Sequence, residues 1–159
     1  MEKKILRNIL FLYFSLVIIK ILIASLVKSP TIFADEYYYM RMARSFFNNH
    51  TFFIDNTFST SYPPLYPILT SIAYIFKDMQ LVYFFMKVIN SLISSLMIVP
   101  IFLIAKEFFN EKKSVLIALL ISVMPPFFII SSYILSENLF YTLFLFSVYF
   151  VYKAFKENK

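Results

Sequence analysis

Two adjacent carboxylates, Asp35 and Glu36, stand near the start of the segment ADEYYYMRMARSFF, just beyond the first apolar run of the chain. A third acid, Glu137, lies in ILSENLF between two later apolar runs. Carboxylates in such places either begin a helix or do chemistry at a membrane surface, as a base for a hydroxyl group or as oxygen ligands of a hard cation. The elements that hold these acids decide between the two interpretations.

Composition is typical of a membrane protein. Apolar residues make up 60% of the sequence, mean hydropathy is +0.75, and only 15% of the residues are charged, whereas about 25% is usual in soluble domains. The chain has no cysteine, which excludes disulfides, thiolate nucleophiles and cysteine metal sites.

Four apolar segments are long enough to be candidates for crossing a bilayer, which takes about 20 residues. They are residues 9–27, 81–104, 115–135 and 139–155. The first follows a basic start but is long for a signal peptide, and no small-residue cleavage motif follows it, so we expect a retained anchor. The sequence therefore predicts an all-α membrane protein with about four transmembrane helices.

The basic residues predict how these spans are oriented. Lysine and arginine gather in residues 1–8, 105–113 and 153–159. The positive-inside rule then places both termini in the cytoplasm and the long loop 28–80 outside, with all three acids on the outer side. This topology accounts for the net charge of +6, so no nucleic-acid partner is needed to explain it.

The outer loop is predicted to carry two short interfacial helices. Residues 36–48 fit an amphipathic helix with two distinct faces. The apolar face consists of Tyr39, Met42, Ala43, Phe46 and Phe47. The polar face consists of Tyr37, Arg41, Arg44 and Asn48. Such a helix lies in the interface plane rather than across the membrane. A polar turn region follows, the prolines of YPPLYP forbid a helix until about Leu65, and a second apolar helix is expected from Leu65 to Phe76.

Local physics alone offers a simpler interpretation of the acids. Asp35 suits the N-cap of the first interfacial helix, and Glu36 suits the positive end of that helix's dipole. Glu137, beside Ser136, suits a second N-cap. This interpretation leaves YPPLYP and the clustering of acids on the outer side unexplained.

Lys20 and Lys87 interrupt two of the apolar spans. A charged side chain that faces lipid costs a few kcal/mol. We therefore expect both lysines to face other helices or to reach the headgroups. Lys87, nearer the outer surface, is also a candidate for a role in a site.

The chain resembles the N-terminal part of GT-C glycosyltransferases in four segments, which are ADEYYYMRMARSFF, YPPLYPILTSIAYIF, KVINSLISSLMIVPIFLIAKEFF and PPFFIISSYILSENLFYTLF. The resemblance is to the branch of dolichyl-phosphate-mannose protein mannosyltransferases and bacterial aminoarabinose or lipopolysaccharide-core sugar transferases. In that branch a first span leads into an outer-face Asp-Glu, a Y-x-x-x-A-R helix and a P-P-L element, for which Pro63-Pro64-Leu65 stands here.

The resemblance implies a polyprenyl- or dolichyl-phosphate sugar donor and a lipid, glycan or protein acceptor on the outer face of the cell membrane. Asp35 matches the catalytic acid, which deprotonates the acceptor hydroxyl or helps to bind a divalent cation, and Glu36 matches its partner. Together with Glu137 they offer a base and hard oxygen ligands for Mg²⁺ or Mn²⁺. No other cofactor is expected.

Tyr62, Pro63 and Pro64 form the predicted substrate loop, which differs from the family pattern at one position. In some relatives a lysine directly before P-P-L holds the donor phosphate, but Tyr62 stands here, followed by Pro63 and Pro64. The candidates to bind the phosphate instead are Arg41, Arg44 and Lys77.

Length is the second departure, because members of this branch are considerably longer. We therefore expect residues 1–159 to form the N-terminal part of a multi-spanning GT-C-like domain, as a fragment, a truncated form or a reduced member. The chain alone is expected to be inactive. The alternative is a non-catalytic membrane scaffold subunit or a degenerate remnant.

Overall fold

The computed structural model describes residues 3–30, 34–55, 57–58 and 62–157. The fold is mainly helical, with one two-stranded hairpin among the described residues. Its elements are α1 (Lys3–Ala24), α2 (Ala34–Asn49), β1 (Phe53–Ile54), β2 (Thr57–Phe58), α3 (Leu65–Ser71), the 3-10 helix η1 (Ile72–Ile75), α4 (Met79–Ser95), α5 (Ile98–Lys106), α6 (Glu111–Ser122), α7 (Pro125–Ile129), the 3-10 helix η2 (Ile130–Ser132) and α8 (Glu137–Glu157).

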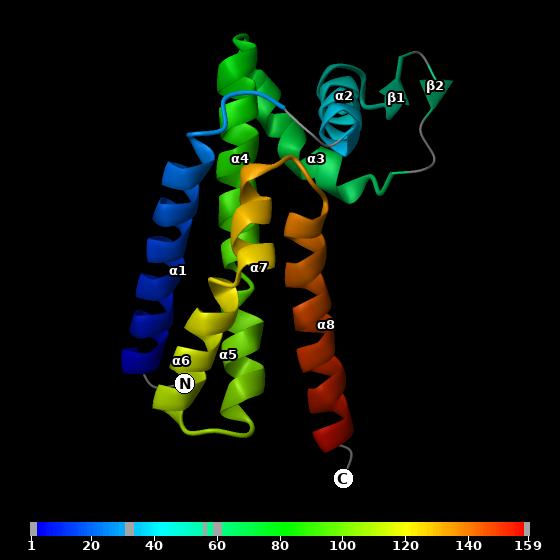
Figure 1. The fold of residues 1–159 in the computed structure, drawn as a ribbon. Helices are drawn as coiled ribbons and strands as arrows, with labels where there is room; N and C mark the ends of the chain where they lie inside the picture. The colour runs from blue at the N-terminus through cyan, green and yellow to red at the C-terminus, as the bar shows by residue number, and fades with distance from the viewer. Residues whose placement is uncertain (1–2, 31–33, 56, 59–61, 158–159) are drawn as a thin grey trace.

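The long helices run roughly side by side, and the remaining elements gather at one end of the bundle (Figure 1). Helix α1, the α4–α5 pair, the α6–α7 pair and α8 form the bundle, while α2, α3 and the hairpin lie together beside the end of α4. The start of α1 and the end of α8 lie at the opposite end of the bundle. Lys153 and Lys156 of α8 pair there with Glu107, which follows α5. Helices α2 and α3 thus lie at the end of the bundle opposite the start of α1 and the end of α8, and the orientation of the bundle in a membrane stays a prediction.

Three helical stretches are long and apolar enough to span a membrane: Ile5–Ala24, Met79–Lys106 and Glu137–Glu157. In the stretch Glu137–Glu157, only 17% of the most apolar 18 residues are buried inside the structure, so most of that helix is free to face lipid. These stretches, in a fold that is mostly helical, confirm the predicted class of all-α membrane protein. The first begins and ends a few residues earlier than predicted, because the helix already includes Lys3 and stops at Ala24.

The predicted third span, residues 115–135, is not one straight helix. Helices α6 and α7 are bent by 66° at a short break, so the pair counts as a fourth span only if it is taken as one broken span. The break precedes Pro125 and Pro126, which lack the amide hydrogen that would continue the ladder of α6. Lys20 of α1 lies beside this break, where its Nζ donates to the carbonyl of Phe127 at 3.2 Å and to Ser94 Oγ at 2.9 Å.

The two intramembrane lysines face other helices, as predicted. Lys20 and Lys87 are each 1% exposed. Lys87 Nζ donates to the carbonyls of Ala24 and Val27, where α1 ends. Because helix C-termini carry unpaired carbonyls and a partial negative charge, a buried ammonium group there is hydrogen-bonded and stabilised.

A buried cluster at the outer-loop end of the bundle holds the candidate site in place. It joins α2, α3, η1, α4 and the turn before α8, and consists of Tyr39, Ala43, Tyr66, Ala73, Val82, Tyr83, Met86 and Ile134. Helix α2 buries the face that its spacing predicts, with Met42 and Ala43 at 0% exposure, although Phe47 is 39% exposed. Packing of this face fixes the rotation of α2, and with it the directions of its polar side chains.

The two segments after α2 agree with the sequence in part. Helix α3 begins at Leu65, directly after the prolines, and the predicted helix to Phe76 is an α-helix to Ser71 followed by η1. The predicted polar turn region contains the hairpin, although residues 56 and 59–61 lie outside the described part of the chain. Asp55 has φ 47° at its turn, a left-handed conformation that aspartate tolerates better than most residues.

Candidate active site

Asp35 lies in the first turn of α2 and is partly buried. The helix already begins at Ala34, so the N-cap role suggested for Asp35 does not describe its position. Its Oδ1 instead accepts a hydrogen bond of 3.0 Å from the hydroxyl of Tyr62. The carboxylate therefore faces the substrate loop, although Tyr62 lies 27 residues later in the sequence.

Tyr62 is held between the rings of two tyrosines of α2. Its ring centroid lies 5.1 Å from that of Tyr38 and 5.2 Å from that of Tyr39. Loss of solvent contact, followed by the hydrogen bond to Asp35, raises the pKa of Tyr62 to about 12. Tyr62 is therefore protonated at neutral pH and serves as the donor, which leaves Asp35 as the acceptor.

Tyr39 connects Asp35 to the turn before α8. It lies one helical turn after Asp35, on the same face of α2, and its hydroxyl donates to Ser136 Oγ at 2.8 Å. Burial is the main cause that raises the pKa of Tyr39, and the nearby charges of Glu137 and Asp35 raise it further. Tertiary packing thus brings Asp35, Tyr62, Ser136 and Glu137 to one place.

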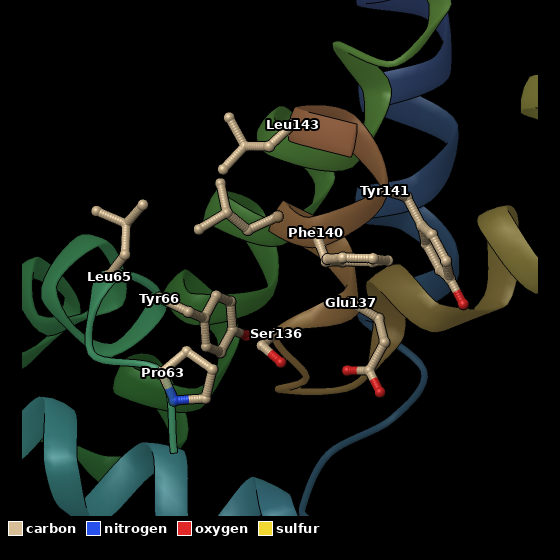
Figure 2. Close-up of a pocket in the computed structure, with 9 residues that line it drawn as sticks. Pro63, Leu65, Tyr66, Ser136, Glu137, Phe140, Tyr141 and Leu143 are labelled. Carbon is tan, nitrogen blue, oxygen red and sulfur yellow. The ribbon is translucent and has the colours of Figure 1, made fainter. Parts of the chain in front are cut away.

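An apolar groove of about 450 Å³ opens beside this cluster, between α3 and α8 (Figure 2). Its lining consists of Pro63, Leu65, Tyr66, Ser136, Glu137, Leu139, Phe140, Tyr141 and Leu143. Ser136, Glu137 and Pro63 lie toward one end of the view and Leu143 toward the other (Figure 2). Glu137 is the first residue of α8, so the six residues to Leu143 carry the groove roughly 9 Å along that helix.

Glu36 is directed elsewhere, although it is adjacent to Asp35 in the sequence. Its side chain is 0% exposed. Its Oε1 accepts from the hydroxyl of Tyr83 at 3.0 Å and from the backbone N–H of Ile134 at 2.9 Å. Neighbouring residues of a helix differ in direction by about 100°. Glu36 therefore points into the buried cluster, whereas Asp35 points toward Tyr62.

The structure does not gather the three predicted metal ligands. Within residues 3–30, 34–55, 57–58 and 62–157, histidine, aspartate and glutamate form no group of three or more that could hold a metal ion. Glu36 is closed inside the protein by Tyr83 and Ile134, so Asp35, Glu36 and Glu137 do not fit a shared Mg²⁺ or Mn²⁺ site.

The predicted phosphate ligands lie away from Asp35. Arg41 and Arg44 follow Asp35 by six and nine residues, which is about 240° and 180° around the helix. Arg41 pairs with Asp55, and this contact raises the pKa of Arg41 and lowers that of Asp55. Both arginines line two smaller pockets, one mainly polar and one mainly apolar, and neither pocket shares a lining residue with the groove. Lys77 is exposed just after η1.

Several residues of the site have no signal in the sequence. Tyr39 and Tyr66 are two of twelve tyrosines, and the pattern predicts only that Tyr39 faces inward. Tyr66 is 1% exposed and donates to Asn90 Oδ1 at 2.8 Å. Asn90 Nδ2 in turn donates to the carbonyl of Tyr133 at 2.7 Å. This chain of hydrogen bonds joins α3 to α4 and to the turn that carries Ser136.

Comparison with known proteins identifies the family of the chain. The family model described as dolichyl-phosphate-mannose-protein mannosyltransferase matches residues 61–159. The chain belongs to this mannosyltransferase family. The match confirms the resemblance to GT-C glycosyltransferases and covers the substrate loop, the groove and Glu137, but it begins after Asp35 and Glu36. No curated protein and no solved structure matches the chain significantly.

Family membership supports a glycosyltransferase-type membrane protein at the level of the superfamily. Within the matched region, Tyr62 contacts Asp35, and Ser136 contacts Tyr39. Side-chain hydrogen bonds thus join α2, which lies outside the matched region, to residues inside that region. These hydrogen bonds place the Asp35 carboxylate next to the region that the family model matches.

Proposed function

We propose that the protein is a GT-C-type glycosyltransferase that moves a sugar from a polyprenyl- or dolichyl-phosphate donor to a hydroxyl acceptor on the outer membrane face. The observation that supports this most strongly is the Asp35 carboxylate, which accepts a hydroxyl hydrogen bond beside the polar end of an apolar groove. The proposal that the donor is lipid-linked and that the reaction occurs at the outer face of the cell membrane rests on the family.

Asp35 is proposed to act as the general base. In the transfer, the acceptor oxygen forms a bond to the anomeric carbon while the bond from that carbon to the phosphate oxygen breaks. The acceptor proton goes to Asp35, and the electron pair leaves with the prenyl phosphate. The hydroxyl of Tyr62 lies 3.0 Å from Asp35 Oδ1, which is the separation that a base needs from the hydroxyl it deprotonates. An acceptor hydroxyl would take the place of Tyr62 at this carboxylate.

The groove suits the prenyl end of the donor. Its walls are mainly leucine and aromatic side chains, several of which are half exposed, such as Leu65 at 48% and Leu143 at 46%. A chain that enters from the bilayer buries apolar surface there and leaves its phosphate at the Ser136 end. Phosphate binding by Arg41, Arg44 or Lys77 stays a prediction, since these side chains lie outside the groove lining.

The direct test is a transfer assay on membranes that contain protein expressed from its complete gene. Polyprenyl-phosphate sugars are supplied, and release of polyprenyl phosphate is followed. Release above that of membranes without the protein supports the proposal. Equal release in both samples would remove the enzymatic proposal and favour a scaffold.

Topology is a separate prediction. Asn49, at the end of α2, and Lys112, in the first turn of α6, are both exposed and lie at opposite ends of the bundle. The chain has no cysteine, so single cysteines at these positions can be labelled selectively. In intact cells, an impermeant thiol reagent should label Asn49→Cys and should label Lys112→Cys only after the membrane is opened. Labelling of Lys112→Cys in intact cells would contradict cytoplasmic termini.

The 159-residue chain by itself should insert into membranes but release no prenyl phosphate. Its groove is open on one side, and no basic side chain is among the described residues that line it, so nothing there neutralises the leaving phosphate. Purified chain with polyprenyl-phosphate sugars and Mg²⁺ or Mn²⁺ tests this expectation. Turnover that disappears in Asp35→Asn would show that the site is complete within these residues.

A further inference from the structure

The carboxylate of Glu36 is the acceptor at which two distant parts of the chain meet. Its Oε1 binds the hydroxyl of Tyr83 in α4 and the N–H of Ile134, which lies 98 residues later. Both donors belong to the buried cluster, since Tyr83 is 2% and Ile134 is 0% exposed. A fully buried carboxylate is costly unless it is hydrogen-bonded or paired, so this arrangement constrains all three segments together.

Lys87 extends this arrangement to α1. Its Nζ lies 4.5 Å from the ring centroid of Tyr83 and donates to the carbonyls of Ala24 and Val27. The ammonium group is therefore close to the tyrosine that donates to Glu36, and it supplies positive charge on the same side of the cluster. The end of α1, the start of α2, the outer half of α4 and the turn at Ile134 are joined by one buried polar network.

The network lies directly behind the proposed site. Glu36 is next to Asp35, and Ile134 precedes Ser136 and Glu137 by two and three residues. Tyr39, one turn beyond Asp35, completes the connection on the site side by donating to Ser136. The hydrogen bond between Glu36 and Ile134 therefore sets how far the turn before α8 stands from the first turn of α2.

We propose that Glu36 is a positioning residue, which acts through Asp35 and the turn at 134–137 and does not contact substrate. The inference rests on the proposed function for its effect on transfer, but its structural part can be tested separately. It departs from the catalytic and metal-ligand roles that the resemblance implies for Glu36. A base or a metal ligand must be open to the substrate, whereas Glu36 is 0% exposed and its Oε1 already accepts two hydrogen bonds.

Replacement by glutamine separates the roles. Glutamine keeps a carbonyl oxygen that can accept from Tyr83 and Ile134, but it has no basicity and no charge. If Glu36 positions the site, Glu36→Gln should retain transfer within about tenfold, because weaker hydrogen bonds remain. Glu36→Ala removes the acceptor and should lose transfer by on the order of 100-fold, as expected when catalytic groups shift by about 1 Å. Rescue by glutamine is the result that a catalytic carboxylate would not give.

The structural readout is hydrogen–deuterium exchange of the Ile134 amide, measured on the same purified proteins. Exchange should stay slow in Glu36→Gln and accelerate in Glu36→Ala. Glu107 supplies the matched control, since it pairs with Lys156 at the opposite end of the bundle. Glu107→Gln and Glu107→Ala should change neither the Ile134 amide nor transfer.

Two results would overturn the inference. One is loss of transfer in Glu36→Gln as deep as in Asp35→Asn while the Ile134 amide stays protected, which would make the carboxylate itself catalytic. The other is an Ile134 amide that exchanges equally slowly in wild type, Glu36→Gln and Glu36→Ala. If the wild type shows no transfer at all, the proposed function fails, and the exchange measurement still decides whether Glu36 holds the turn.

Discussion

Asp35→Asn should reduce sugar transfer by about 100- to 10,000-fold, the usual contribution of a positioned general base. The substitution keeps the size of the side chain and an oxygen that can accept from Tyr62, but it removes the basicity needed to take the acceptor proton. Expression and membrane insertion should be unchanged, because the carboxylate is only partly buried and faces a hydroxyl. The measurement is release of polyprenyl phosphate by equal amounts of wild-type and variant protein.

Asp55→Asn is the matched control for this experiment. Asp55 is exposed, belongs to the hairpin, and accepts from Arg41 and from Tyr37. Asparagine tolerates the left-handed backbone at this position as well as aspartate does, so the turn should persist. The exposed ion pair contributes little to stability, and transfer should remain within about threefold of wild type. Equal activity of wild type and Asp35→Asn would leave Asp35 as a helix-start residue that binds Tyr62.

Leu143→Trp should raise the KM for long prenyl donors by about tenfold and change kcat much less. Leu143 lies at the end of the groove opposite Ser136 and Glu137 (Figure 2), where an indole ring would fill the space that we propose for the prenyl chain. Loss of about two buried methylene groups, at about 0.8 kcal/mol each, weakens binding roughly tenfold. The test compares KM for donors with long and short prenyl chains.

Val148→Trp is the control for the groove. Val148 is on the same helix and is 40% exposed, but it does not line the groove. Both substitutions enlarge an exposed side chain of α8 and should insert equally well, so a difference between them reports on the groove. An unchanged KM in Leu143→Trp for every chain length would place the prenyl chain elsewhere.

The amphipathic pattern of α2 and the prolines before α3 show how far local sequence reaches. The spacing of Met42 and Ala43 predicts the buried face of α2, because a regular helix fixes which residues share a face. The prolines predict where α3 begins, because they restrict the backbone before it. The same rule applied to Pro125 and Pro126 would have predicted the break in the span 115–135, whereas hydropathy alone suggested one helix.

The candidate site was only partly predictable. The sequence draws attention to Asp35, Glu36 and Glu137 as acids on one side of a membrane, but it does not give their directions. Glu36 turns into the core because helix rotation is set by the packing of Tyr39, Met42 and Ala43 against neighbouring helices. Arg41 and Arg44 point away from Asp35 for a different reason, because six and nine residues along a helix correspond to about 240° and 180°, so their predicted phosphate role gained no support from placement.

By itself, the sequence determined a helical membrane protein, because the lengths of the apolar runs depend on local composition. It also determined the ends of several helices, through prolines and periodicity. The tertiary structure alone decided that Tyr62 is the partner of Asp35 and that Glu36 is held by Tyr83 and Ile134. Those contacts join residues 27 to 98 positions apart, and such pairs form only when whole helices pack, which no local pattern encodes.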